Sequence, residues 1–75
     1  GTEYLWIIDY KTAALPAGID RDLFLAAARE QYRTQLESYS ELFRKLLELD
    51  EAAARRQHRL ALYHPMLPWL DWWRP

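Results

Sequence analysis

The feature that most constrains the fold is the segment from Asp22 to Leu49, which contains neither glycine nor proline. Apolar residues recur in it at a spacing of three or four, at Leu25, Ala28, Tyr32, Tyr39, Phe43 and Leu46. This spacing matches the turn of an α-helix, so one face of the segment is expected to be apolar. We therefore predict a long helix over residues 22–49, capped by Asp20 or Asp22, because an aspartate side chain accepts backbone N–H bonds.

Short β-forming segments flank the predicted helix. Residues 4–8 form an aromatic and aliphatic run, typical of a strand covered on both faces. Residues 59–63 and 69–73 predict two more strands around a proline-containing turn, and residues 50–56 are either a short second helix or a continuation of the first. A strand, a helix and a strand form a crossover between parallel strands. The fold class is thus α/β (α+β): a strand–helix–strand crossover with a possible short C-terminal hairpin.

Length and composition limit what such a chain can be. Its 75 residues make at most one small domain with a modest core, and it contains no cysteine. The lack of cysteine excludes disulfides and thiolate metal sites and fits a cytoplasmic protein. A formal net charge of −1 argues against binding nucleic acid by charge alone, and no apolar run is long enough for a membrane span. Because the chain starts without methionine and almost inside a strand, we expect residues 1–75 to be a single partial domain of something longer.

The first strand ends in an unusual way, in the sequence IIDYKT of residues 7–12. Asp9 and Lys11 are two residues apart, so on a strand they point to the same side. Gln35 lies within about 60° of the centre of the helix's apolar stripe, where an unsatisfied amide costs about 1–3 kcal/mol. Since the helix of a crossover packs across the preceding strand, Gln35 could meet Asp9 or Lys11. Alternatively, the side-chain amide of Gln35 contacts solvent at the edge of the stripe, and Asp9 and Lys11 form a simple surface ion pair.

These segments together resemble a known family. IIDYKT at a strand end, YRTQLESYS on a helix and RLALYHP on a strand resemble the C-terminal half of a RecB-type nuclease domain of the PD-(D/E)XK superfamily. That family has a DYK-T/S strand end, then a helix with Gln-x-x-x-Tyr, often a tyrosine three residues before the glutamine (here Tyr32), and an A-x-L-Y-type strand. The resemblance extends from about Trp6 to Tyr63 and implies part of a restriction-endonuclease-like fold.

The resemblance also implies a function and a set of site residues. Asp9 corresponds to a metal ligand, Lys11 to the catalytic lysine and the carbonyl of Tyr10 to a possible further metal contact. Gln35 and Tyr39 correspond to helix residues that line the site and help to hold Lys11 or the DNA. The implied parent is a Mg²⁺- or Mn²⁺-dependent exonuclease that acts on single-stranded or duplex DNA ends in recombinational repair. In this family such domains occur either attached to a helicase domain or subunit or as free exonucleases. In such chemistry the metal takes oxygen ligands and activates water, while a lysine stabilises phosphoryl charge.

The chain departs from the family pattern because only eight residues precede Asp9. The family's upstream acidic ligand and upstream histidine therefore cannot be present. We expect half a site, little nuclease activity from the chain alone and no tightly bound metal in it. Four other polar residues match no motif position and are interpreted as caps, surface residues or turn residues: Asp20, Asp22, His58 and His64.

Two alternatives remain open from the sequence. The chain could be a catalytically degenerate nuclease fold kept for a structural or protein-interaction role, or a small domain in which the DYK sequence is coincidental. The tail PWLDWW, residues 68–73, is either a contact surface or packs against the missing upstream half. If the chain folds by itself, we expect it to self-associate through exposed strand edges and tryptophans.

Overall fold

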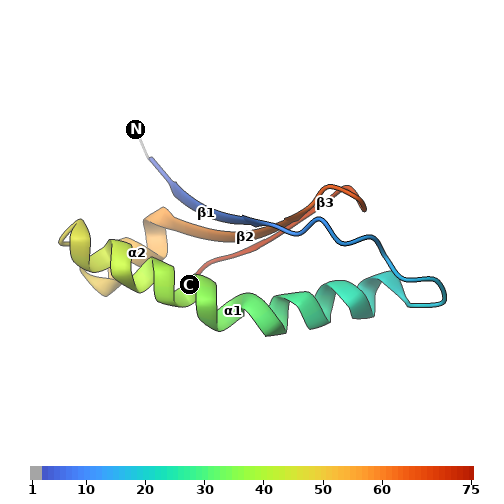
Figure 1. Ribbon diagram of the computed structural model, residues 1–75. Coiled ribbons are helices and arrows are strands. Elements are labelled where there is room, and N and C mark those ends of the chain that lie inside the picture. Colours follow the sequence, from blue (N-terminus) through green and yellow to red (C-terminus); the bar gives the residue numbers. More distant parts are fainter. Residues whose placement is uncertain (1–2) are drawn as a thin grey trace.

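The fold is a small α+β arrangement in which helices pack on one side of a mixed three-stranded sheet (Figure 1). The computed structural model describes residues 3–75, with the elements β1 (Leu5–Tyr10), α1 (Arg21–Leu46), α2 (Glu51–Gln57), β2 (His58–His64) and β3 (Trp69–Trp73). The sheet order is β1-β2-β3, with β1 parallel and β3 antiparallel to β2. The predicted crossover between parallel strands and the C-terminal hairpin are both confirmed.

Side-chain caps fix where each helix begins. Asp20, and not Asp22, caps α1, because its carboxylate accepts a hydrogen bond from Leu23 N at 3.0 Å. The helix closes near Glu48, which has a φ of 56°, and Leu49 N donates to Arg44 O at 2.9 Å. Asp50 then accepts from the backbone of the next turn and starts α2. The second helix is therefore a separate element and not a continuation of the first.

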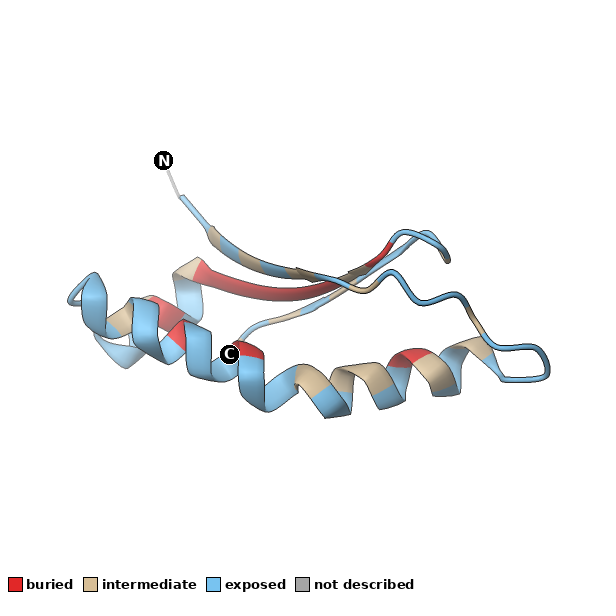
Figure 2. Ribbon diagram, viewed as in Figure 1, coloured by how far each residue is buried: buried red, intermediate tan, exposed pale blue. Residues whose placement is uncertain are grey.

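The core lies between α1 and the central strand β2. It is formed by Leu36, Leu60 and Leu62, each at most 2% exposed, and Figure 2 shows β2 buried along nearly its whole length. Tyr39, Phe43 and Leu46, predicted to share the apolar stripe, are instead exposed. Tyr39 lies on the side of α1, rotated by about 100° from the buried Ser40. Phe43 and Leu46 lie beyond the sheet, because 26 helical residues extend about 39 Å whereas the 7-residue β2 extends about 23 Å. The last turns of α1 therefore have no sheet to pack on.

One face of the sheet is open, which corrects the prediction that the first strand is covered on both faces. Among residues 3–75, both helices lie on the same side of the sheet (Figure 1). The other side carries the exposed side chain of Tyr4, which precedes β1, and exposed side chains of β1 and β3, namely Trp6, Ile8, Tyr10, Leu70 and Trp72. β1 thus alternates between half-buried and exposed residues. We call these six residues the open face.

Within residues 3–75, no helix combines the length and the apolar character needed to cross a membrane.

The small core makes a sharp stability prediction. Leu36→Ala leaves a cavity at the centre of the helix–sheet contact, so we expect it to lower the free energy of unfolding by about 2–5 kcal/mol. Leu42→Ala removes the same atoms from a side chain on α1 that is 52% exposed. This variant should change the free energy of unfolding by no more than about 0.5 kcal/mol. Urea unfolding followed by circular dichroism measures both. Equal losses in the two variants would contradict the assignment of the core.

Candidate functional site

The candidate site lies where the parallel strands β1 and β2 end side by side. Lys11 follows β1 directly, and its backbone N–H donates to the carbonyl of Tyr63 at 2.8 Å, which extends the ladder one residue beyond the strand. The C-terminal ends of parallel strands are where α/β sheets usually form their binding sites. The topology therefore brings Asp9, Lys11 and His64 to one edge of the sheet.

Asp9 and Lys11 form a half-buried ion pair held against α1. Lys11 Nζ lies 2.7 Å from Asp9 Oδ2, and the two side chains are 21% and 33% exposed respectively. The same ammonium lies 3.3 Å from the centroid of the Tyr32 ring, which adds a cation–π contact. Tyr32 thus fixes the position of the lysine, although the sequence singled it out only as the tyrosine before Gln35.

Gln35 and Tyr39 contact each other and not the ion pair. Gln35 Nε2 donates to Tyr39 Oη at 3.2 Å, and both side chains are exposed. Of the two alternatives for Gln35, the contact with Asp9 or Lys11 is not made, and the exposed amide at the side of the helix is confirmed. The physical reason is that Leu36 occupies the centre of the buried stripe, and a neighbouring residue is rotated from it by about 100°.

Tyr10 presents only its backbone to this end of the sheet. Its side chain is 64% exposed on the open face, where its ring meets the Tyr63 ring edge-on at a centroid distance of 5.6 Å. A role in metal binding can therefore involve its carbonyl oxygen alone, as the family resemblance implies.

The donor set at this edge fits only part of a magnesium site. Mg²⁺ requires near-octahedral oxygen coordination, usually with one or two carboxylates. Residues 3–75 contain no group of three or more histidine, cysteine, aspartate or glutamate side chains able to hold a metal. The other nearby carboxylate, Asp71, is held by Arg29 through two hydrogen bonds of 2.8 and 3.1 Å that join α1 to β3. The chain therefore supplies one carboxylate, Asp9, and one carbonyl, Tyr10.

His64 is a residue whose environment the sequence interpretation missed. It was interpreted as a cap, surface or turn residue, but it ends β2 and is 1% exposed. Neither of its ring nitrogens has a hydrogen-bond partner. It lines, together with Lys11 and Tyr32, a cavity of about 240 Å³. The available signal was its position at the end of a strand parallel to the one that ends in Asp9 and Lys11.

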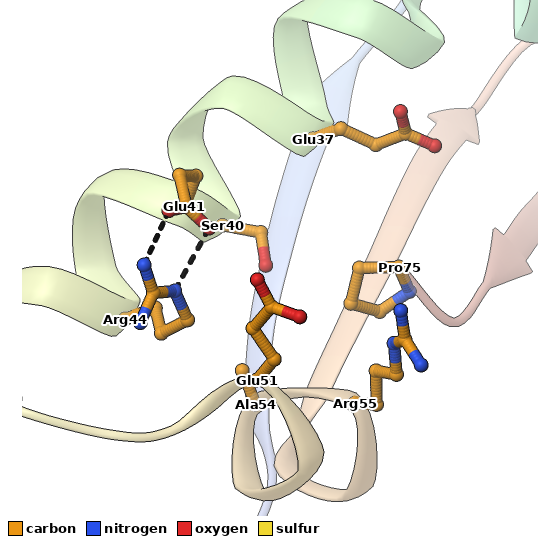
Figure 3. Close-up of a pocket in the computed structure, with 8 residues that line it drawn as sticks. All are labelled: Glu37, Ser40, Glu41, Arg44, Glu51, Ala54, Arg55 and Pro75. Atoms are coloured by element: carbon orange, nitrogen blue, oxygen red, sulfur yellow. Dashed lines mark hydrogen bonds and ion pairs between the residues drawn. The ribbon is translucent and has the colours of Figure 1, made fainter.

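A second cavity, of about 300 Å³, lies between the end of α1, α2 and Pro75 (Figure 3). Arg44 donates to Glu41 at 2.5 and 2.9 Å and to the carbonyl of Leu49 at 3.1 Å. Its hydrogen bond lowers the pKa of Glu41, and the Arg44 pKa is raised in return. Arg44 thus joins Glu41 to the backbone that follows α1 and closes the end of the helix, so we assign these contacts a structural role.

Ser40 and His58 form a buried pair beside that second cavity. Ser40 Oγ lies 2.7 Å from His58 Nδ1, and both residues are at most 4% exposed. Such a pair could suggest a nucleophile and its base, but the serine lies within α1 and beneath the sheet. The contact instead ties α1 to the start of β2. His58, which follows α2 as its C-cap, is therefore not a surface residue.

Comparison of the chain with protein families, with curated proteins and with solved structures found no match. The site is therefore judged by its own geometry. That geometry joins Asp9, Lys11, Tyr32 and His64, and leaves Gln35 about one helical turn and Tyr39 about two helical turns beyond Tyr32.

The two buried histidines predict a fold that acid weakens. Burial lowers the pKa of His58 and His64; Asp71 opposes the shift of His64 and Lys11 adds to it. The unfolded chain therefore takes up protons at a higher pH than the folded chain. The free energy of unfolding should be constant above the ordinary histidine value, near 6.5, and fall below it by at most about 1.4 kcal/mol per pH unit per histidine.

Urea unfolding between about pH 7.5 and 5.5 measures this dependence, because aspartate and glutamate titrate mostly below that range. His64→Leu removes one of the two titrating groups and should reduce the slope. A free energy of unfolding that is flat over this range in the unchanged chain would show that the histidines are not buried as neutral groups.

Proposed function

We propose that the chain is the C-terminal part of a RecB-type nuclease domain with a restriction-endonuclease-like fold. The intact domain is a Mg²⁺- or Mn²⁺-dependent exonuclease that processes DNA ends in the cytoplasm. The observation that carries the proposal is the half-buried Asp9–Lys11 pair, held by Tyr32 at the C-terminal end of β1. An exposed surface ion pair would lack this burial and the ring that fixes the lysine. Arg29 and Asp71 form a similarly buried pair beside Trp73, so it is the place of the Asp9–Lys11 pair at the C-terminal end of β1 that supports a function.

Each residue has a role in this proposal. Asp9 and the carbonyl of Tyr10 would supply two oxygen ligands, and the further carboxylates would come from residues upstream of this chain. The bound metal supplies an activated water and a polarised phosphate. Lys11, oriented by Asp9 and Tyr32, stabilises negative charge on the phosphoryl oxygens. Gln35 and Tyr39 stay available on the exposed flank of α1 to contact the DNA.

The open face favours a second candidate function, a catalytically degenerate module that binds another protein. Trp6 and Trp72 pack edge to face with ring centroids 5.8 Å apart, and each is more than 40% exposed. Exposed aromatic clusters of this kind are typical of interaction surfaces. This candidate function depends on the open face as the binding surface. It gives the Asp9–Lys11 pair no role beyond stabilising the fold.

A nuclease assay tests the leading proposal. The natural protein, extended upstream by about 100–150 residues to complete a domain, should degrade linear single-stranded DNA when Mg²⁺ or Mn²⁺ is supplied. Lys11→Ala should reduce the rate by at least about 100-fold, because a donor aimed at developing charge is worth that much. The readout is the release of labelled nucleotides.

Lys45→Ala is the matched control, because Lys45 is an exposed lysine near the end of α1 and far from the candidate site. It should leave the rate unchanged. Equal rates for Lys11→Ala and the unchanged, folded domain would refute the catalytic role of Lys11. A folded domain with no activity under either metal would favour the degenerate module.

The open face also predicts how the 75-residue chain behaves in solution. We expect it to self-associate, because the aromatic side chains of this face lose contact with water when two copies meet. Trp6→Glu should shift the chain toward the monomer in analytical ultracentrifugation. Ile19→Glu changes a loop residue that is 47% exposed and should have no effect. A chain that is monomeric at high concentration without either change would contradict the expectation.

A further inference from the structure

Arg59, the second residue of β2, is the most deeply buried arginine or lysine among residues 3–75. It is 6% exposed, and no carboxylate in the described chain forms an ion pair with it. Four other cationic residues are partly buried, and each is paired with a carboxylate: Lys11, Arg21, Arg29 and Arg44. Because a buried charge without a counter-charge weakens a fold, a carboxylate from another molecule would stabilise Arg59.

Half of the Arg59 guanidinium group is used by the fold. Its Nη1 donates to the backbone carbonyls of Arg56 at 2.9 Å and His58 at 2.8 Å, and so closes the end of α2. Its Nε and Nη2 groups make no hydrogen bond within the described chain. Arg29 and Arg44 each use the same two nitrogens to bind both oxygens of a carboxylate. Arg59 therefore keeps vacant the pair of donors that holds a carboxylate elsewhere in the molecule.

The vacant donors of Arg59 are open to a ligand. In the part of the chain that the structure describes, side-chain atoms that are sealed from solvent and lack a partner belong to His58, His64 and Trp73, and none to Arg59. Side chains alternate along β2, so Arg59 lies on the side opposite the core residue Leu60. That side of the sheet is the open face.

Aromatic rings of the open face surround the guanidinium group. Its carbon lies 4.3 Å from the centroid of the Tyr4 ring and 6.0 Å from that of Trp72, and Trp6 is the residue paired with Arg59 across the sheet. Arginine, tryptophan and tyrosine are the residues that contribute most to binding at protein interfaces. The exposed parts of the six open-face residues sum to an area on the order of 500 Å². One side of a standard interface buries about 800 Å², so the face suits a short polypeptide segment.

Two other occupants fit this face less well. A second copy of the chain covers the rings but supplies no carboxylate, because the acids of the strands, Asp9 and Asp71, are paired on the helix side. A single strand of nucleic acid stacks on aromatic rings, but it gains affinity from several cations along its phosphates. Arg59 is the single arginine or lysine of the three strands.

We propose that the open face binds a short segment of a partner protein in which a carboxylate lies between apolar side chains. The carboxylate accepts hydrogen bonds from Nε and Nη2 of Arg59, and its apolar neighbours pack on Trp6 and Trp72. This inference rests on the protein-binding function proposed for the open face, to which it adds the chemistry of the partner. It does not depend on the Asp9–Lys11 pair, which lies on the other side of the sheet.

The experiment is an NMR titration of the folded 75-residue chain with two blocked pentapeptides at neutral pH. One peptide has a central glutamate between phenylalanine and leucine, with a glycine at each end, and the other has glutamine in place of the glutamate. The glutamate peptide should shift the Nε–H signal of Arg59 and the indole signals of Trp6 and Trp72, with a Kd on the order of 1 mM. The glutamine peptide should bind at least about 10-fold more weakly. Trp73 is the internal control, because its ring packs against Arg29 on the helix side.

A variant of the arginine tests the same pairing from the side of the protein. Arg59→Gln removes the charge, so the glutamate peptide should bind it at least about 10-fold more weakly than the unchanged chain. Arg56→Gln is the matched control, because Arg56 is an exposed arginine of α2, and it should bind as the unchanged chain does. Circular dichroism shows whether each variant is folded.

A second pair of variants leaves Arg59 in place. Trp6→Glu puts a carboxylate directly beside Arg59 on the neighbouring strand, where it should take the vacant donors. Trp6→Gln removes the same ring without adding a charge. The glutamate peptide should therefore bind Trp6→Glu at least about 10-fold more weakly than Trp6→Gln.

Equal affinity of the two peptides for the unchanged chain would overturn the role of the carboxylate and leave the protein-binding function of the open face standing. Binding of neither peptide would refute both. Shifts of Arg59 by inorganic phosphate or acetate alone that equal those by the glutamate peptide would show a simple anion site and overturn the inference. Tighter binding of a short oligothymidylate than of the glutamate peptide would also overturn it, in favour of a nucleic-acid surface.

Discussion

The packing of Leu36 against Leu60 and Leu62 is the contact on which the rest of the structure depends. It fixes which side of α1 meets the sheet, and therefore which neighbouring residues face β1. Tyr32, one turn before Leu36, is brought over Lys11, while Gln35 is turned away to solvent. The geometry at the end of β1 is thus a consequence of one small hydrophobic contact. If the helix were rotated by one residue, other side chains would take the places of Leu36 and Tyr32.

Local patterns in the sequence predicted the elements but not the face that each helix buries. The helix, the three strands and their order along the chain follow from apolar spacing, the prolines and the aspartates before the helix, of which Asp20 is the cap. Phe43 and Leu46 continue the apolar spacing, yet they are exposed because the sheet ends before the helix does. The apolar spacing within the helix carries no information about the length of the strands on which the helix packs. The position of Gln35 could not be predicted for the same reason, since it depends on where the stripe is centred.

The burial of His64 could not be read from its neighbours in sequence either. It precedes Pro65, which favours a turn, but β2 is the central strand and its last residue is covered by α1 and β3. Asp9 and Lys11 were recognised because an acid and a base are conspicuous at the end of an apolar strand. A histidine at the end of the neighbouring parallel strand becomes informative only when the pairing of the strands is known.

The two polar groups at this edge of the sheet differ in how well they are satisfied. Lys11 has a carboxylate, an aromatic ring and a backbone hydrogen bond, so its position is fixed. His64 packs against the Phe24 ring, and its carbonyl accepts from Leu67 N at 3.1 Å, but both of its ring nitrogens lack a partner and remain buried at a cost in stability. A core selected for stability alone would replace the imidazole with an apolar side chain of similar size. Lys11 is therefore the group at this edge whose position the fold holds fixed, whereas His64 is the group at which the fold loses stability.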